Sequence, residues 1–212
     1  MRVPRVRRSA TLCAAGIVLA IAAAGCSGSE DGVPATRAET APFGPLCDQL
    51  PQGSDPGGPE LLRDMTAEEA LTWIPVLTVF EAGVRASGLD EDLREADGVT
   101  ILAPTDGTFD DTFTEATLDD LILFRQDELR TLLQAHMIEG EHTIAALVEA
   151  GRVTTLAGTT IEVTAASAGA RFDGSASTQC ADYETANARI HIIDGVLGEL
   201  PAPAPEDPGP EG

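Results

Sequence analysis

The sequence predicts a single α+β domain, because helical and strand patterns occupy different halves of the chain. Apolar residues recur at helical spacing through the first half, and the period changes to two after Gly151. A doubly wound parallel sheet would alternate the two patterns throughout, so that class is disfavoured. With 212 residues and 43% apolar composition, the chain has enough material for one core of ordinary size.

Two short helices are expected early in the domain. Thr66-Ala67-Glu68-Glu69 is a capping box, and the helix that it starts should end or kink at Ile74-Pro75. In segment 76–88 the apolar residues keep helical spacing, and Gly88 is placed as a C-terminal cap. The first predicted helix therefore has a start signal in its own sequence, and the second has a stop signal.

A buried strand and further helices should follow. Asp97-Gly98 predicts a turn before the β-branched run VTILA, residues 99–103, which suits a buried strand. Segment 117–137 carries two apolar helical stripes separated by the polar stretch FRQDE, and HTIAALVEAG, residues 142–151, is typical of a short helix that ends at its glycine. Helices thus dominate up to Gly151.

The junction after the VTILA strand has a simple physical interpretation. Pro104 has no N–H for a sheet ladder and holds Ala103 extended, so the strand must finish there. Thr105 or Asp106 can then accept hydrogen bonds from the free N–H groups of a following helix. Phe109 should fold back into the core, which makes the junction a corner of the fold rather than a binding site.

Strands are expected in the last third of the domain. VTTLAGTTIEVTA, residues 153–165, alternates with Ile161 and Val163 on one face, and a second strand is expected near 170–174. ARIHIIDGVL, residues 188–197, is predicted as the last strand. No internal repeat is visible.

The two ends of the chain are predicted to lie outside the domain. Residues 1–25 combine a cluster of arginines with an uncharged apolar stretch, which is typical of an export signal. Residues 26–45 are expected to be a flexible tether, residues 46–200 the domain, and residues 201–212 a disordered Pro-rich acidic tail.

The residues that precede Cys26 indicate how the signal is removed. Ala23-Ala24-Gly25-Cys26 resembles a bacterial lipobox, in which the cysteine is diacylated and becomes the mature N-terminus. Ordinary secretion is the alternative. Arg7-Arg8 loosely fits a twin-arginine signal, so the export route stays open.

Cysteine usage points to a disulfide. Of four cysteines, Cys13 leaves with the signal and Cys26 is consumed by lipid, so Cys47 and Cys180 remain as a pair. A pair outside the cytosol should be oxidised, and the bridge would close nearly the whole domain into one loop. Two unpaired buried thiols are the alternative, which would require a reducing compartment.

The charge of the chain excludes several classes of function. There are 35 acidic against 13 basic residues, the formal net charge is −22, and every basic residue is Arg. Such a surface repels nucleic-acid phosphates and anionic lipid headgroups. The absence of Lys excludes Schiff-base lysines and the Walker A lysine.

A search for catalytic and metal-binding motifs finds none. The mature chain has neither G-x-S-x-G nor HExxH. His136 and His142 lack the spacing of paired helical ligands, so we expect core packing for His136 and solvent exposure for His142. An EF-hand is rejected, and Trp73 and Tyr183 are the only Trp and Tyr, which disfavours a carbohydrate enzyme.

Three landmarks resemble the signatures of fasciclin (FAS1) domains. VTILAPTDGTFDD, residues 99–111, resembles the first signature, and LLQAHMIEGEHT, residues 132–143, resembles the family's Leu-Leu-x-Tyr-His-x-x-x-Gly segment. ARIHIIDGVL resembles the second signature, with its His-x-Ile-Asp-x-Val-Leu core. GPLC at Cys47 and the stretch 179–197 are most similar to mycobacterial-type secreted antigens with a single fasciclin domain.

The resemblance implies a β-sandwich-like wedge with several packed helices. It also implies that a cysteine pair at the positions of Cys47 and Cys180 joins the two ends of the domain. His191 is expected to be a hydrogen-bonded structural histidine, and Asp194 the residue that turns the chain after it. We expect the motif residues as a group to be structural: Ala103, Pro104, Thr105, Asp106, Phe109, His136, His191 and Asp194.

The function implied is that of a non-enzymatic, lipid-anchored, extracytoplasmic adhesion protein. Its expected partner is a surface protein or glycan, with no cofactor, no metal, no nucleic acid, and a monomeric state. Ala135-His136 replaces the Tyr-His pair implicated in receptor adhesion in animal relatives, so integrin-like binding is not carried over. A carrier of a small apolar ligand is the alternative, because some fasciclin relatives bind carotenoids, and an envelope hydrolase is a third hypothesis.

Overall fold

The computed structural model describes residues 41–204 of the chain. The predicted signal peptide, the lipidation site at Cys26 and residues 205–212 lie outside the described residues. Within the described range, no helix is long and apolar enough to cross a membrane.

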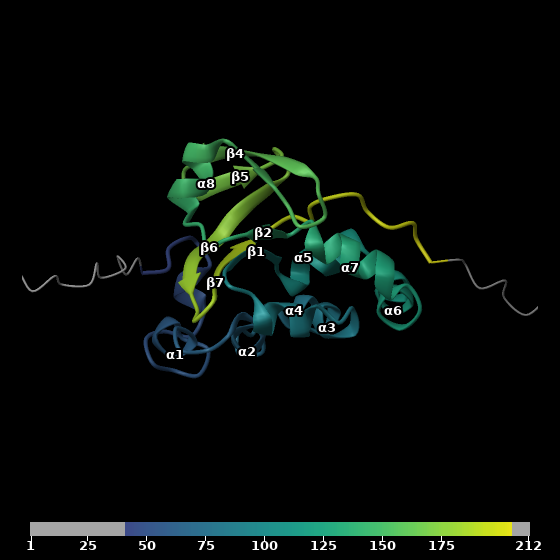
Figure 1. The fold of residues 1–212 in the computed structure, drawn as a ribbon, viewed down its shortest axis with the longest axis horizontal. Coiled ribbons are helices and arrows are strands. Elements are labelled where there is room, and N and C mark those ends of the chain that lie inside the picture. Colours follow the sequence, from purple (N-terminus) through teal and green to yellow (C-terminus); the bar gives the residue numbers. More distant parts are fainter. Residues whose placement is uncertain (1–40, 205–212) are drawn as a thin grey trace, which may run out of the picture. The chain divides into compact units, whose positions relative to one another are not determined.

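Helices dominate the chain up to residue 150, as the sequence predicts (Figure 1). Before the first strand lie the 3-10 helix η1 (Cys47–Gln49) and the helices α1 (Pro59–Leu62), α2 (Ala67–Leu71), α3 (Thr78–Ala86) and α4 (Leu89–Glu95). After it come α5 (Asp106–Thr112), α6 (Glu115–Leu123), α7 (Gln126–Gln134) and α8 (Ile144–Ala150).

The predicted start of α2 and the predicted end of α3 are found where the sequence places them, whereas α2 ends at Leu71, before the expected stop at Ile74-Pro75. The capping box at the start of α2 is present, because the Thr66 side chain accepts from the Glu69 N–H and the Glu69 carboxylate accepts from the Thr66 N–H. Gly88 adopts the left-handed conformation, with φ +71°, at the end of α3. The chain then enters α4 at once, a helix that the sequence analysis did not predict.

Seven strands form one sheet in the order β2-β1-β7-β6-β5-β4-β3. The strands are β1 (Val99–Pro104), β2 (Met137–Glu139), β3 (Arg152–Thr154), β4 (Thr160–Ala166), β5 (Gly169–Phe172), β6 (Ala176–Glu184) and β7 (Ala188–Ile193). β1 and β7 are parallel, with Leu102 opposite His191 and Pro104 opposite Ile193. The strands of the two signature segments therefore run side by side and finish at the same end of the sheet.

The two outer strands of the sheet, β2 and β3, lie next to each other. Ile138 of β2 forms an antiparallel bridge with Thr155, which directly follows β3. The Leu156 N–H donates to the Met137 carbonyl at 2.7 Å. The sheet is thus curled until its edges meet, which satisfies backbone groups that would otherwise be exposed at a sheet edge.

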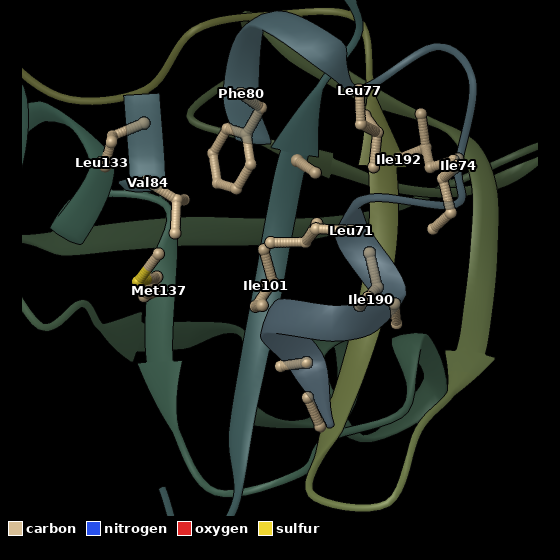
Figure 2. Packing of buried hydrophobic residues seen from close by; sticks show 14 of the residues in the cluster. Leu71, Ile74, Leu77, Phe80, Val84, Ile101, Leu133, Met137, Ile190 and Ile192 are labelled. Atoms are coloured by element: carbon tan, nitrogen blue, oxygen red, sulfur yellow. The ribbon is translucent and has the colours of Figure 1, made fainter. Parts of the chain in front are cut away.

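Two apolar cores lie on opposite faces of the central strands. On one face, Phe80 and Val84 of α3 and Leu133 of α7 pack near Ile101 and Ile190 of β1 and β7 (Figure 2). On the other face, the second core contains members from β1, β4, β5, β7 and α8: Leu102, Ile161, Val163, Phe172, Ile193 and Leu147. Because both faces are covered, every residue of β1 is buried, which explains why its sequence is apolar except at Thr100, whose hydroxyl donates to the Gly140 carbonyl.

Several sequence-based expectations need correction. Segment 117–137 is not one helical stretch, since α6 and α7 are separate helices and Met137 begins β2. The last strand ends at Ile193 rather than at Leu197. Segment 153–165 is not one strand, since β3 and β4 are separated by a turn. Strand β6 was not expected, because its burial alternates only as far as Cys180 and every residue beyond it is buried, with two register shifts in its pairing with β7.

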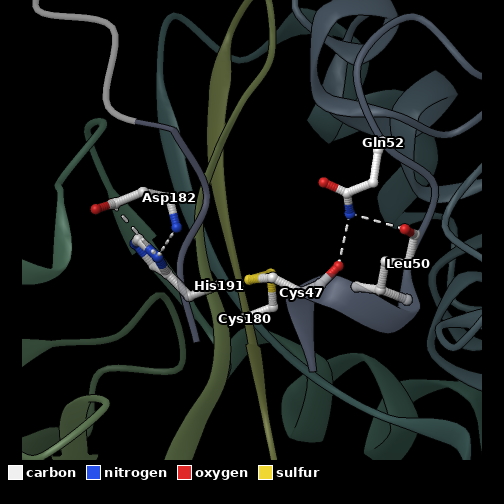
Figure 3. The surroundings of a disulfide bond; sticks show 6 residues. All are labelled: Cys47, Leu50, Gln52, Cys180, Asp182 and His191. Atoms are coloured by element: carbon white, nitrogen blue, oxygen red, sulfur yellow. Dashed lines mark hydrogen bonds and ion pairs between the residues drawn. A yellow bond between two sulfur atoms is a disulfide. The ribbon is translucent and has the colours of Figure 1, made fainter. Parts of the chain in front are cut away.

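A disulfide joins Cys47 in η1 to Cys180 in β6 (Figure 3). The bonded residues are 133 positions apart in the sequence. The Gln52 side-chain amide donates to the carbonyls of Cys47 and Leu50 at 2.7 and 2.8 Å. The disulfide therefore ties the start of the domain to the central sheet, and Gln52 fixes the turn around Cys47.

The described structure extends slightly past the expected domain limits of 46 and 200. Phe43 exchanges both backbone hydrogen bonds with Ala181 of β6, at 3.2 and 2.8 Å. Gly44 lies so close to β6 that an added Cβ would be 2.4 Å from the Gln179 carbonyl oxygen. At the other end, the Ala204 N–H donates to the Thr117 hydroxyl at 3.2 Å.

Candidate interaction site

A surface groove of about 460 Å³ lies between α7, the β3–β4 turn and the chain after β7. We call it the α7 groove. It is lined by Asp127, Glu128, Thr131, Leu132 and Ala135 of α7, by Ala157 and Thr159 of the turn, and by residues 198–202. Figure 1 shows this C-terminal segment, in yellow, passing α7 toward α6. Its volume is within the range of roughly 300–1,000 Å³ typical of ligand sites.

The C-terminal wall of the groove is fixed by hydrogen bonds at three points. The Leu197 N–H donates to Nε2 of His136 at 2.9 Å. Arg125 donates from Nη1 to the Ala202 carbonyl at 2.8 Å. Together with the contact of Ala204 to Thr117, these bonds hold residues 197–204 against α6 and α7.

The floor of the groove depends on two small residues. Gly198 has φ +86°, and an added Cβ there would be 2.7 Å from the Ala135 Cβ. The C-terminal segment can lie against α7 only because both side chains are small. Ala135 is the position at which the fasciclin pattern has tyrosine. In this protein the Gly198 backbone lies against the small Ala135 side chain, where the pattern has an aromatic ring.

Carboxylates stand at the rim of the groove. Glu128 is paired with Arg125, which also bonds Asp120, and the hydrogen bond from Arg125 lowers the pKa of Glu128. Among the described residues, Asp127 and Glu199 have no ion-pair partner. No basic residue lines the groove in this part of the chain.

His136 supports the groove from beneath. The ring is fully buried, and Nε2 accepts from Leu197, so the proton of the neutral ring lies on Nδ1 and is donated to the Leu132 carbonyl at 2.9 Å. Burial lowers the pKa of His136 to about 4. Both ring nitrogens are therefore used to join α7 to the chain after β7.

His191 also has both ring nitrogens in hydrogen bonds, at the centre of the sheet. Its Nδ1 accepts from the Asp182 N–H at 3.0 Å, so Nε2–H donates to the His142 carbonyl at 2.9 Å. Burial lowers the pKa of His191 to about 4 and raises the pKa of the neighbouring Asp182 carboxyl. Figure 3 shows the His191 ring directed at Asp182.

The residues of the first signature turn the chain after β1 and cap two helices. The Thr105 hydroxyl accepts from the Thr108 N–H at 3.2 Å and so caps α5, and Phe109 is buried in the core. Asp106 instead accepts from the Thr78 hydroxyl at 2.7 Å and from the Val79 N–H at 2.8 Å. Of the two alternatives left open by the sequence, Thr105 is the cap of its own helix and Asp106 caps α3.

Asp194 of the second signature lies close to the first signature. It accepts from the Ser177 N–H at 2.6 Å and from the Gln179 amide at 2.8 Å, which fixes the turn after β7 against β6. Thr105, Asp106 and Asp194 line one hollow of about 350 Å³. Their oxygens are already engaged within the protein, so this hollow offers a ligand less free chemistry than the α7 groove does.

Replacement of Thr105 by alanine is expected to lower the free energy of unfolding by about 1 kcal/mol. The loss reflects the uncapped Thr108 N–H at the start of α5. Urea unfolding followed by circular dichroism measures the difference. Thr105→Ser keeps the hydroxyl and should retain most of the stability; an equal loss in both variants would contradict the capping role.

The histidines considered as metal ligands in the sequence do not form a metal site in the described structure. His142 is partly buried rather than fully in solvent, and its Nε2 lies 2.9 Å from the Glu139 carbonyl. Across residues 41–204, no three His, Cys, Asp or Glu side chains cluster in a way that could hold a metal ion. The sequence does not predict the C-terminal wall of the α7 groove, because the Pro-rich composition of residues 201–212 predicts a disordered tail. Its one indication of this region is Ala135, which stands where the fasciclin pattern has tyrosine.

Comparisons with known proteins agree with the motifs. The family model of the Fasciclin domain matches residues 75–199. Transforming growth factor-beta-induced protein ig-h3 from Sus scrofa is 34% identical over 117 residues, and its counterpart from Oryctolagus cuniculus is 35% identical over 117 residues. In each case the match covers 55% of this chain but only 17% of the relative.

A solved structure shares the fold. It is a FAS1 domain pair from the insect cell adhesion molecule fasciclin I, with a TM-score of 0.56 and 19% identity over 65% of this chain and 52% of that one. At this identity the likeness concerns the fold alone, an α+β domain in which helices cover a seven-stranded sheet. The family-model match extends over more than half of the chain, and the protein therefore belongs to the Fasciclin domain family.

Proposed function

We propose that the protein is a non-catalytic adhesion or interaction module that acts outside the cytosol and binds a surface protein or glycan through the α7 groove. The groove carries the proposal, because it combines the half-exposed Leu200 with the carboxylates of Asp127 and Glu199, which have no ion-pair partner in the described structure. The relative from insects is described as a cell adhesion molecule, which supports the same class of role.

The mode of attachment is a separate part of the proposal. The lipobox-like sequence before Cys26 supports a diacylated N-terminus that holds a monomeric domain at the membrane. Two or three acyl chains at ~0.8 kcal/mol per buried CH₂ give durable anchoring and a high local concentration of the groove. The GPLC and 179–197 stretches support a place among the mycobacterial-type single-domain proteins.

A carrier of a small apolar ligand is less well supported by the same groove. Carrier sites bury most of their ligand in an apolar surround. In the α7 groove, Asp127, Glu128 and Glu199 stand beside the apolar floor and Leu200 is 50% exposed. A macromolecular partner with its own polar groups suits this surface better.

Filling the groove is expected to weaken adhesion. Thr131 is exposed and lines the groove, so Thr131→Trp places a large ring there, and beads coated with this variant should retain fewer cells than wild-type beads. Thr164→Trp, at an exposed position of β4, is the matched control and should retain cells like the wild type. Equal retention by the two variants would refute the groove as the adhesive surface.

Lipid attachment has its own test. Growth of intact cells with an alkyne-tagged fatty acid should label the wild-type protein, and Cys26→Ala should abolish the label and release the protein into the medium. A wild-type chain that carries no label would remove the anchor from the proposal while leaving the role of the groove open.

A further inference from the structure

The chemistry of the α7 groove restricts what it can bind. Leu132 and Ala135 at its floor are each 3% exposed, and the half-exposed Leu200 offers apolar surface in its wall. Asp127 and Glu199 present carboxylates without ion-pair partners in the described structure. With no basic residue in its lining, the groove offers negative charge next to apolar area. Its complement is a ligand that has cationic groups next to aliphatic ones.

Several occupants are unfavourable on charge. The C-terminal residues 205–212, PEDPGPEG, contain three acidic residues and no basic one, so they would be repelled by the rim. A second copy of this chain is also unfavourable, because each copy has a formal net charge of −22. Nucleic acids and anionic lipid surfaces are excluded by the same sign of charge.

We propose that the α7 groove recognises a short extended protein segment in which Lys or Arg alternates with aliphatic side chains. This inference rests on the proposed function and names the class of partner. The aliphatic side chains would lie against Leu200 and Pro201, and the cationic ones would reach Asp127 and Glu199. Loss of water from this partly apolar groove strengthens such charge pairs relative to pairs on an open surface.

The test uses labelled hexapeptides and fluorescence anisotropy with the full mature chain in its oxidised form. The probe alternates Leu and Lys; a second peptide alternates Leu and Glu, and a third alternates Gly and Lys. Saturable binding is expected for the Leu/Lys probe alone, and raising the salt concentration to about 0.5 M should weaken it.

Variants locate the binding. The double variant Asp127→Asn/Glu199→Gln should bind the Leu/Lys probe about fivefold more weakly. Asp110→Asn/Asp111→Asn removes the same charge from two exposed positions of α5 that do not line the groove, and it should bind within about twofold of wild type. Thr131→Trp should compete with the aliphatic side chains for space and abolish binding.

Three other outcomes of these binding measurements would overturn the inference. Equal weakening by the two double variants would mean nonspecific attraction to an acidic protein, and equal binding of the Gly/Lys peptide would mean that the apolar wall plays no part. Absence of saturable binding by the Leu/Lys probe overturns the partner class. If cell attachment still depends on Thr131 in that case, the proposed function stands and only the partner's chemistry is wrong.

Discussion

Replacement of Cys47 and Cys180 together by alanine is expected to lower the free energy of unfolding by about 3–5 kcal/mol. The bridge joins residues 133 positions apart, so it removes much of the freedom of the unfolded chain. It also holds the segment around Phe43 and Gly44 on β6. Urea unfolding of the variant and of the oxidised wild type, followed by circular dichroism, measures the difference.

Two controls separate the covalent link from its surroundings. Reduction of the wild type should lower its stability by about as much as the double substitution does. Gln52→Ala removes the hydrogen bonds to Cys47 and Leu50 but keeps the bridge, and it should cost only about 1 kcal/mol. A double variant as stable as the oxidised wild type would show that the disulfide does not constrain this domain.

Acidification from pH 7.5 to 4.5 is expected to lower the free energy of unfolding by about 5 kcal/mol through His136 and His191. Burial holds the pKa of each ring at about 4, against 6.5 in the unfolded chain. Between about pH 6.5 and 4 the unfolded state binds protons that the folded state does not, so stability falls as the pH falls through this window. Each ring contributes about half of the loss.

Protonation is unfavourable because each ring already accepts a backbone hydrogen bond. His136→Gln can still accept from the Leu197 N–H and does not titrate, so its free energy of unfolding should fall by about 2.5 kcal/mol less than that of the wild type between pH 7.5 and 4.5, even if it is less stable at pH 7.5. Urea titrations across the pH range give the comparison, and an unchanged slope in His136→Gln would contradict this account of the ring.

Local signals predict those parts of the fold that local chemistry determines. The capping box at Thr66 and the glycine caps at Gly88 and Gly151 lie where the helices start and end. β1 is predictable because its burial on both faces leaves a β-branched run that is apolar except at Thr100. In contrast, β6 has two register shifts and contains Asp182 with φ +63°, and its burial alternates only as far as Cys180, so its sequence gives a weak strand signal.

The candidate site was less predictable than the fold, because long-range packing creates it. Composition makes Pro201 and Ala202 resemble a tail, yet the chain there is fixed by Arg125, 77 residues away from Ala202 in sequence. The contact of Gly198 with Ala135 depends on two small residues 63 positions apart. The absence of the family's tyrosine at position 135 indicates a departure there, but it does not show that the C-terminal segment fills the space.

Site-specific photocrosslinking on intact cells tests the central claim most directly. A photoreactive phenylalanine at Thr131 would sit in the α7 groove, and the same group at Thr164 would sit on the exposed face of β4. The account predicts that position 131 captures a discrete surface partner, identified by mass spectrometry, and that position 164 does not. Capture of the same partners from both positions, or of none from position 131, would contradict it.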